Sequence, residues 1–126
     1  MTRLADGRRV IDQEWVRSSL GRVHARAEVL KLMNWQVAAG GSGLGPAAAS
    51  ATKVYGTELA LEVYRVLMDV VGPTASLPEG SLGDVLAGRL ERNYRAQTIF
   101  TFGGGANEVQ RDIIAMVGLG MPRAPR

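Results

Sequence analysis

A chain of 126 residues can form one domain with a single apolar core, and 46% hydrophobic with 21% charged residues is a globular composition. The absence of cysteine excludes disulfides and cysteine-ligated metals, and the single His24 excludes a site of several histidines. Basic and acidic residues are mixed along the chain, so the net charge of +3 forms no dense patch for nucleic acid. No apolar run reaches the ~18–20 residues of a membrane span or resembles a secretory leader, so we expect a cytoplasmic protein.

The chain begins with a polar arm, predicted over residues 1–11, and a long helix follows it. Asp12 is placed to cap this helix near Gln13, because its carboxylate can accept the free amides of a first helical turn. Apolar residues then recur at spacings of three and four until Gly40 and Gly41 end the helix. The predicted apolar face consists of Val16, Leu20, Val23, Ala27, Leu30 and Val37.

A second long helix is predicted over residues 46–71. Pro46 suits a first helical turn, and the pair Gly72-Pro73 ends the helix. Alanines in the first half allow a neighbouring helix to approach closely, and the second half has apolar residues on most sides. We therefore expect this helix to lie at the centre of the fold.

Two shorter helices are predicted in the last third of the chain. The third begins at a cap provided by Ser81 or Asp84 and ends near residue 97, and the fourth covers residues 106–117. The residues of the fourth helix that are expected to face inward are Val109, Ile113, Ile114 and Val117. No repeat or convincing strand is visible, so the predicted fold is all-α, a helical bundle of two long and two shorter helices.

Few side chains of this sequence are candidates for chemistry. His24 lies on the first helix without a partner near it in the sequence, which is typical of a structural or exposed histidine. Glu58 and Glu62 lie one helical turn apart, as on a solvated helix face, and Lys53 and Arg65 are spaced to pair with them. The residues alone therefore assemble no catalytic constellation.

The glycine loop before the fourth helix is the most informative stretch. Gly103, Gly104 and Gly105 let another molecule approach the main chain, and the amides of the following helix start suit an anion. The loop is not a Walker loop, because the required Lys-Ser/Thr pair is missing. A plain turn capped by Asn107 explains the same residues, so both interpretations stay open at this point.

A family resemblance covers nearly the whole chain. Residues 95–123, RAQTIFTFGGGANEVQRDIIAMVGLGMPR, resemble the closing segment of flavin-dependent acyl-CoA dehydrogenases, and GRRVIDQEWVR and VLMDVVGP are similar to upstream parts of that family's C-terminal domain. The resemblance implies an arm over residues 1–11 and the family's C-terminal helical-bundle domain over residues 12–126. The family's N-terminal helical domain and middle β domain have no counterpart in this sequence.

The resemblance implies a role in the α,β-dehydrogenation of an acyl-CoA thioester. In that family a carboxylate removes the α-proton while the β-hydride passes to FAD. The enzymes are mostly tetramers, hold FAD partly across a subunit boundary and commonly use an electron-transfer flavoprotein as acceptor. We therefore expect a homo- or hetero-oligomer in which this chain contributes FAD and subunit contacts and is inactive alone.

The resemblance also implies two segments that contact FAD. The matched residues are Asp69, Val71 and Gly72, at the end of the second helix, and Gly103, Gly104, Gly105, Ala106, Asn107 and Glu108, in the loop and helix start. The first segment is expected to reach the FAD of a neighbouring subunit. Ala106 stands where many relatives have threonine, and Asp69 stands where several have glutamine.

No residue of the chain matches a catalytic base. One branch of the family carries the base in this loop, at the position that Gly104 occupies, and Glu108 falls four residues later on the helix. Another branch places the base on the helix before the one that starts near Gln13. The base is then expected on a segment outside this sequence or on a competent subunit that pairs with this chain.

The helix that precedes Gln13 in the family also bears on assembly. Without that helix, the bundle would expose apolar surface that drives self-association or capture of a partner, so we expect no stable monomer. The alternative to an enzyme domain is a non-enzymatic helical interaction subunit derived from the same fold.

Overall fold

The computed structural model describes residues 7–40, 43, 45–77, 80 and 87–123. Within these ranges the chain forms four α-helices and no strand, and no helix combines the length and apolarity needed to cross a membrane. The elements are η1 (Val10–Asp12), α1 (Glu14–Ala38), α2 (Pro46–Val71), η2 (Pro73–Ser76), α3 (Ala87–Phe100), α4 (Asn107–Ile113) and η3 (Ile114–Gly118). The predicted all-α bundle of two long and two shorter helices is confirmed.

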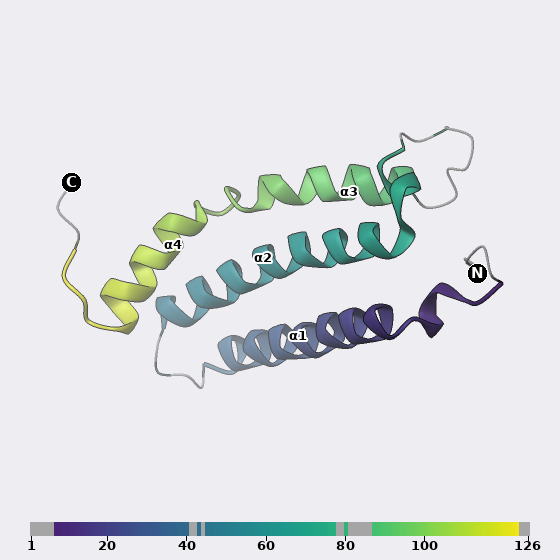
Figure 1. The fold of residues 1–126 in the computed structure, drawn as a ribbon. Coiled ribbons are helices and arrows are strands. Elements are labelled where there is room, and N and C mark those ends of the chain that lie inside the picture. Colours follow the sequence, from purple (N-terminus) through teal and green to yellow (C-terminus); the bar gives the residue numbers. More distant parts are fainter. Residues whose placement is uncertain (1–6, 41–42, 44, 78–79, 81–86, 124–126) are drawn as a thin grey trace.

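Helix α2 lies at the centre of the fold (Figure 1). Helices α1 and α3 pack along opposite sides of α2, and α4 with η3 packs against its N-terminal half. Apolar residues on most sides of α2 explain this position, because each neighbouring helix finds an apolar stripe to cover. The predicted central position of the second helix is confirmed.

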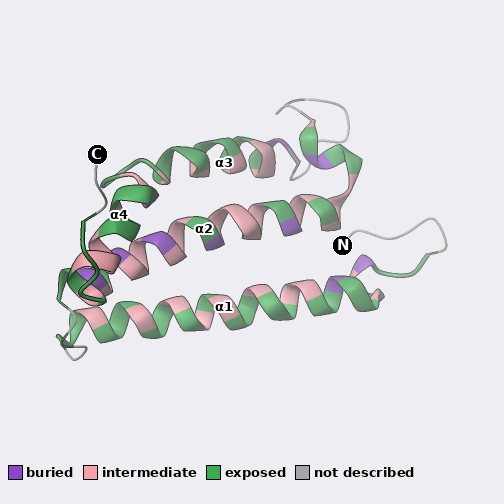
Figure 2. Ribbon diagram, turned by 60° about the vertical axis from the view of Figure 1, so that its left-hand side comes forward, coloured by how far each residue is buried: buried purple, intermediate pink, exposed green. Residues whose placement is uncertain are grey.

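The buried core of the described residues is small, as Figure 2 shows. Its apolar members are Val10, Val16, Ala47, Val54, Leu59, Val66 and Ala75. In contrast, Trp35, Ile99 and Phe102 are 62%, 68% and 71% exposed. Because α1 and α3 lie on opposite sides of α2, they leave wide helix faces uncovered. Such faces are typical of surfaces that another segment or chain covers.

The start of α1 differs from the predicted one. The N-cap is Gln13 and makes no side-chain cap, whereas the carboxylate of Asp12 accepts the Arg9 amide at 3.2 Å and the Arg9 guanidinium at 2.6 Å. The predicted cap at Asp12 is therefore wrong, because Arg9 occupies its carboxylate. The same hydrogen-bonded guanidinium lowers the pKa of the Asp12 carboxyl below its ordinary value. The arm boundary at residue 12 stays a prediction, although Val10 is already buried.

Helix α3 extends to Phe100, beyond the predicted end near residue 97. After it, the Thr101 amide donates to the Thr98 carbonyl at 3.3 Å, and the amides of Phe102 and Gly103 both donate to the Ile99 carbonyl at 3.0 Å. The hydrogen bonding of the helix end therefore continues into the loop. The predicted caps Ser81 and Asp84 lie outside the described residues.

The fourth helix was predicted to turn four apolar residues inward, and two of the four are wrong. Ile113 and Ile114 are half-buried, but Val109 and Val117 are 52% and 57% exposed. The physical reason is that Asn107, only 4% exposed, sets the face that α4 turns towards α2. A polar anchor, rather than the apolar stripe, determines the rotation of this helix.

We predict that Val16→Ala lowers the free energy of unfolding by about 2 kcal/mol, because it removes two carbon atoms from a side chain that is 0% exposed. Val29 lies on the same helix and is 45% exposed, so Val29→Ala is the matched control with a small effect. Urea unfolding at one fixed protein concentration measures both values. Equal losses in the two variants would contradict the position of Val16 in the core.

Candidate functional site

The loop between α3 and α4 is a closed turn over residues 101–106. The Gly105 amide donates to the carbonyl of Phe102 at 3.2 Å, and the Asn107 amide donates back to the carbonyl of Thr101 at 3.0 Å. The second bond joins the first residue of α4 to the beginning of the loop. The loop therefore has a defined shape although three of its residues are glycines.

Two of the glycines have backbone angles that favour glycine over other residues. Gly104 has a φ of +69° and Gly105 a φ of +99°. A Cβ at Gly105 would lie 2.7 Å from Nε2 of Gln110, whereas a Cβ at Gly104 would meet no atom within 4 Å. Nε2 of Gln110 donates to the Gly104 carbonyl at 3.1 Å. At Gly104 the loop therefore presents main-chain atoms and no side chain.

Lys53, on the central helix α2, binds this loop. Its Nζ donates to the Gly105 carbonyl at 2.8 Å, to the Thr101 carbonyl at 3.2 Å and to Oδ1 of Asn107 at 2.6 Å. An ammonium group has three N–H donors, and these three acceptors match that number. One side chain thus joins the start of the loop, its end and the first residue of α4.

Asn107 continues this network on the other side. Its Nδ2 donates to Oγ1 of Thr57 at 3.1 Å and lies 3.4 Å from Oε1 of Glu58. Glu58 also accepts a hydrogen bond from the guanidinium of Arg111. Every polar atom of the buried Asn107 side chain is therefore paired, as burial of an amide requires.

These contacts correct three expectations from the sequence. Asn107 is not the cap of α4, because Ala106 holds that position and Asn107 is the first helical residue. Lys53 binds the loop instead of Glu58 or Glu62. Arg65 donates to the hydroxyl of Tyr94 at 3.2 Å, so it too bonds across to a neighbouring helix.

The carboxylates Glu58 and Glu62 were expected on a solvated face, but both bond to other helices. Glu58 pairs with Arg111 of the last α-helix. Glu62 pairs with Arg26, and Arg22 lies 3.7 Å away, so this carboxylate binds α1. The sequence missed these partners because spacing along a helix identifies only neighbours on the same helix.

The second predicted segment, Asp69, Val71 and Gly72, lies at the other end of α2. Sixteen residues of helix separate Lys53 from Asp69, which corresponds to about 24 Å. The structure therefore does not bring the two predicted segments together within one chain. Asp69 is exposed, and Gly72 ends the helix with a φ of +84° and an amide that donates to the Met68 carbonyl at 2.8 Å.

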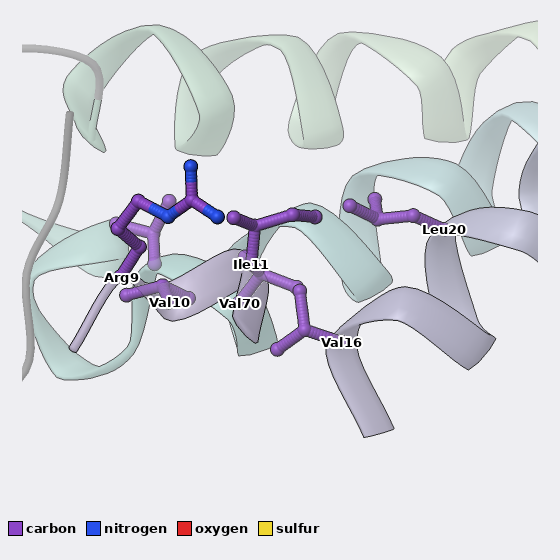
Figure 3. Close-up of a pocket in the computed structure, with 7 residues that line it drawn as sticks. Arg9, Val10, Ile11, Val16, Leu20 and Val70 are labelled. Carbon is purple, nitrogen blue, oxygen red and sulfur yellow. The ribbon is translucent and has the colours of Figure 1, made fainter. Parts of the chain in front are cut away.

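Val71 lines a small apolar pocket between η1, α1 and the end of α2. Figure 3 shows this pocket, and its volume is about 210 Å³. It is lined by Arg9, Val10, Ile11, Val16, Leu20, Val70 and Val71. Its lining offers no carboxylate, hydroxyl or imidazole, so the pocket has no group for acid–base chemistry.

Other candidates for chemistry lie apart from the loop. His24 is exposed on α1, and Glu108 is exposed on the first turn of α4. Within the residues that the structure describes, no group of three or more His, Asp or Glu side chains could hold a metal ion. The site that the geometry supports is therefore the lysine-bound glycine loop. The one signal for Lys53 in the sequence is that it is one of two lysines in a chain whose other Lys and Arg positions are all arginine.

Residues 1–119 match the family described as acyl-CoA dehydrogenase, C-terminal domain. The chain belongs to this family, and the resemblance found in its motifs is confirmed. The chain is 59% identical over 130 residues to acyl-CoA dehydrogenase FadE26 of Mycobacterium tuberculosis (strain ATCC 25618 / H37Rv), with 99% of this chain and 32% of that protein covered. It is 39% identical over 116 residues to acyl-CoA dehydrogenase FadE29 of the same organism, with 92% and 30% covered.

Two solved structures show the same fold. The crystal structure of the ChsE4-ChsE5 complex from Mycobacterium tuberculosis contains a chain that is 62% identical, with a TM-score of 0.88 over 98% of this chain and 32% of that chain. The Tcur3481-Tcur3483 steroid ACAD contains one that is 43% identical, with a TM-score of 0.82 over 91% and 30%. The chain thus spans about a third of the length of these relatives.

We predict opposite stability effects for two glycine substitutions. Gly104→Ala is expected to lower the free energy of unfolding by about 1–2 kcal/mol, because alanine is strained at a φ of +69°. Gly21→Ala is the control, since Gly21 lies within α1 with no atom near its missing Cβ. Alanine there is expected to raise stability by about 0.5–1 kcal/mol. Urea unfolding that shows no difference between the variants would contradict the left-handed backbone at Gly104.

Proposed function

We propose that this chain serves as the C-terminal domain of an FAD-dependent oxidoreductase that forms an α,β double bond in an acyl-CoA thioester. Its membership in the acyl-CoA dehydrogenase family supports this function. The observation that carries the proposal is the glycine loop, which Lys53 and Asn107 hold in a defined shape with its main chain open.

The open main chain suits the approach of a flat ring system. Gly103, Gly104 and Gly105 are all exposed, and a Cβ at Gly104 would enter free space. Larger side chains at these positions would cover the main chain that a flavin ring can approach. Ala106 has no hydroxyl to offer the cofactor, so the proposed contact relies on the main chain.

In this role the chain positions groups and does not transfer a proton in the loop. Bound FAD supplies the hydride-accepting chemistry of the reaction. The described loop contains no carboxylate, and Glu108 lies beyond it on the exposed first turn of α4. We therefore propose that the α-proton leaves to a carboxylate outside the loop, on another segment of the enzyme or on a partner subunit.

The segment of Asp69, Val71 and Gly72 is proposed to face the FAD of a neighbouring subunit. Its distance of about 24 Å from Lys53 along α2 favours contact with a different part of the assembly from the loop. The exposed carboxylate of Asp69 is unfavourable beside a pyrophosphate, because like charges repel.

We further propose that the enzyme is a hetero-oligomer. One solved relative is described as the ChsE4-ChsE5 complex, and the other carries two names, Tcur3481-Tcur3483. The exposed side chains of Leu32 and Trp35 on α1 and of Ile99 on α3 support a surface that a partner covers. Because one relative is named a steroid ACAD, the proposed substrate is the CoA thioester of a steroid-derived acid, with an electron-transfer flavoprotein as acceptor.

We predict that coexpression with a second subunit of the same family yields a complex with flavin absorbance, whereas this chain alone is colourless. Gel filtration followed by an absorbance spectrum and FAD quantification measures the outcome, and the second subunit alone is the control. A steroid-CoA thioester is expected to bleach the flavin faster than a short straight-chain acyl-CoA. A stable but colourless complex would contradict the enzyme function and favour the alternative, a non-enzymatic helical partner.

A second prediction concerns the charge at Asp69. Asp69→Asn is expected to increase FAD retention by the same complex several-fold, because it removes a negative charge near the proposed pyrophosphate position. Glu14→Gln, an exposed change at the start of α1, is the charge-matched control and leaves retention unchanged. Equal retention in Asp69→Asn and the unsubstituted complex would show that Asp69 does not face the cofactor.

A further inference from the structure

We propose that Lys53 is a positioning residue that sets the direction of the Gly103–Gly105 main chain towards the flavin. The inference rests on the proposed function, because it assigns the loop to FAD. It goes beyond that function by assigning control of the loop to a residue of the central helix. Lys53 lies outside the segments that the family motif associates with the cofactor.

The first argument is the number and placement of its acceptors. Nζ of Lys53 donates to carbonyl oxygens at both ends of the loop, of Thr101 and of Gly105, and to the side chain of Asn107. The three bonds converge on one atom, so the distance between the two ends of the loop depends on where that atom lies. Movement of Nζ would shift both ends together.

The second argument is that all three acceptors are uncharged oxygens. Many lysines are held by a carboxylate, as Lys31 is by Glu28 in this chain. In contrast, Lys53 donates to two main-chain carbonyls and an amide oxygen. Hydrogen bonds to a charged donor are stronger than those between neutral groups, so the ammonium orders the loop more firmly than a neutral side chain would.

The third argument is that Asn107, an acceptor of Lys53, is itself bonded to α2. Asn107 is buried, receives the Lys53 bond at 2.6 Å and donates to Thr57, one helical turn after Lys53 on α2. The Asn107 amide also closes the loop onto Thr101. The loop is thus bonded to α2 at its ends, while the space beside Gly104 is open, which is the arrangement that a positioning role requires.

The chain offers a selective test, because it has two lysines and no cysteine. Lys53→Met keeps the length of the side chain and removes the ammonium. Lys53→Cys, alkylated with bromoethylamine, restores an ammonium at nearly the original distance. Lys53→Arg keeps the charge but has a planar fork in place of a tetrahedral group. Lys31→Met and alkylated Lys31→Cys are the matched controls on exposed α1.

Amide exchange of the full chain tests the anchoring itself, without any flavin. In Lys53→Met, the Gly105 and Asn107 amides are expected to exchange at least about tenfold faster, while amides near Val16 stay unchanged. The alkylated cysteine variant is expected to return both amides to their original exchange rates. In Lys53→Arg, both amides are expected to keep exchanging faster than in the unsubstituted chain. Unchanged exchange in Lys53→Met, or equal acceleration throughout the chain, would overturn the positioning role.

The flavin spectrum of the complex tests the direction of the loop. Lys53→Met is expected to weaken FAD binding about tenfold and to shift the flavin absorption band, with both changes reversed in the alkylated cysteine variant. A normal spectrum and affinity in Lys53→Met would overturn the inference. A colourless complex of the unsubstituted chain would instead refute the proposed function and the flavin part of the inference. In that case the amide-exchange data would still show whether Lys53 anchors the loop.

Discussion

The fold depends on the packing of one helix, α2, against all of its neighbours. Helices α1 and α3 do not pack against each other to form a closed core, so the burial available to them comes from α2. This explains why its buried residues, such as Val54, Leu59 and Val66, are spread over its length. It also explains why the bundle has few fully buried side chains for its size.

Polar side chains of α2 orient each of the helices that its apolar surface holds. Glu62 pairs with Arg26 on α1, Arg65 bonds to Tyr94 on α3, and Lys53 bonds to Asn107 on α4. Apolar contact is not directional, so it leaves a helix free to rotate and slide, whereas a hydrogen bond fixes one position. The central helix therefore supplies both the attraction and the register of the bundle.

The sequence predicted the parts of the structure that depend on local chemistry. The bounds of the second helix agree with Pro46 and Gly72, because proline and glycine act on the backbone where they stand. The terminal motif identified the family. In contrast, the partners of Lys53 lie 48 to 54 residues away, and no local rule connects a lysine with two distant carbonyls. The exposure of Val109 was missed for the same reason, since a buried asparagine sets the rotation of α4. The cofactor contacts at Asp69 and in the loop remain predictions.

The left-handed backbone at Gly104 limits how this loop can evolve. A Cβ at this position would meet no atom within 4 Å, so there is space for a side chain. The obstacle to a side chain is the φ of +69°. A glutamate at this position would favour a different φ, and that change would pull on the bond from Gln110 and on the adjacent turn at Gly105. Aspartate tolerates left-handed angles better than glutamate but has a shorter reach. A carboxylate at position 104 would therefore require coupled changes at Gly105 and Gln110 and not one substitution alone.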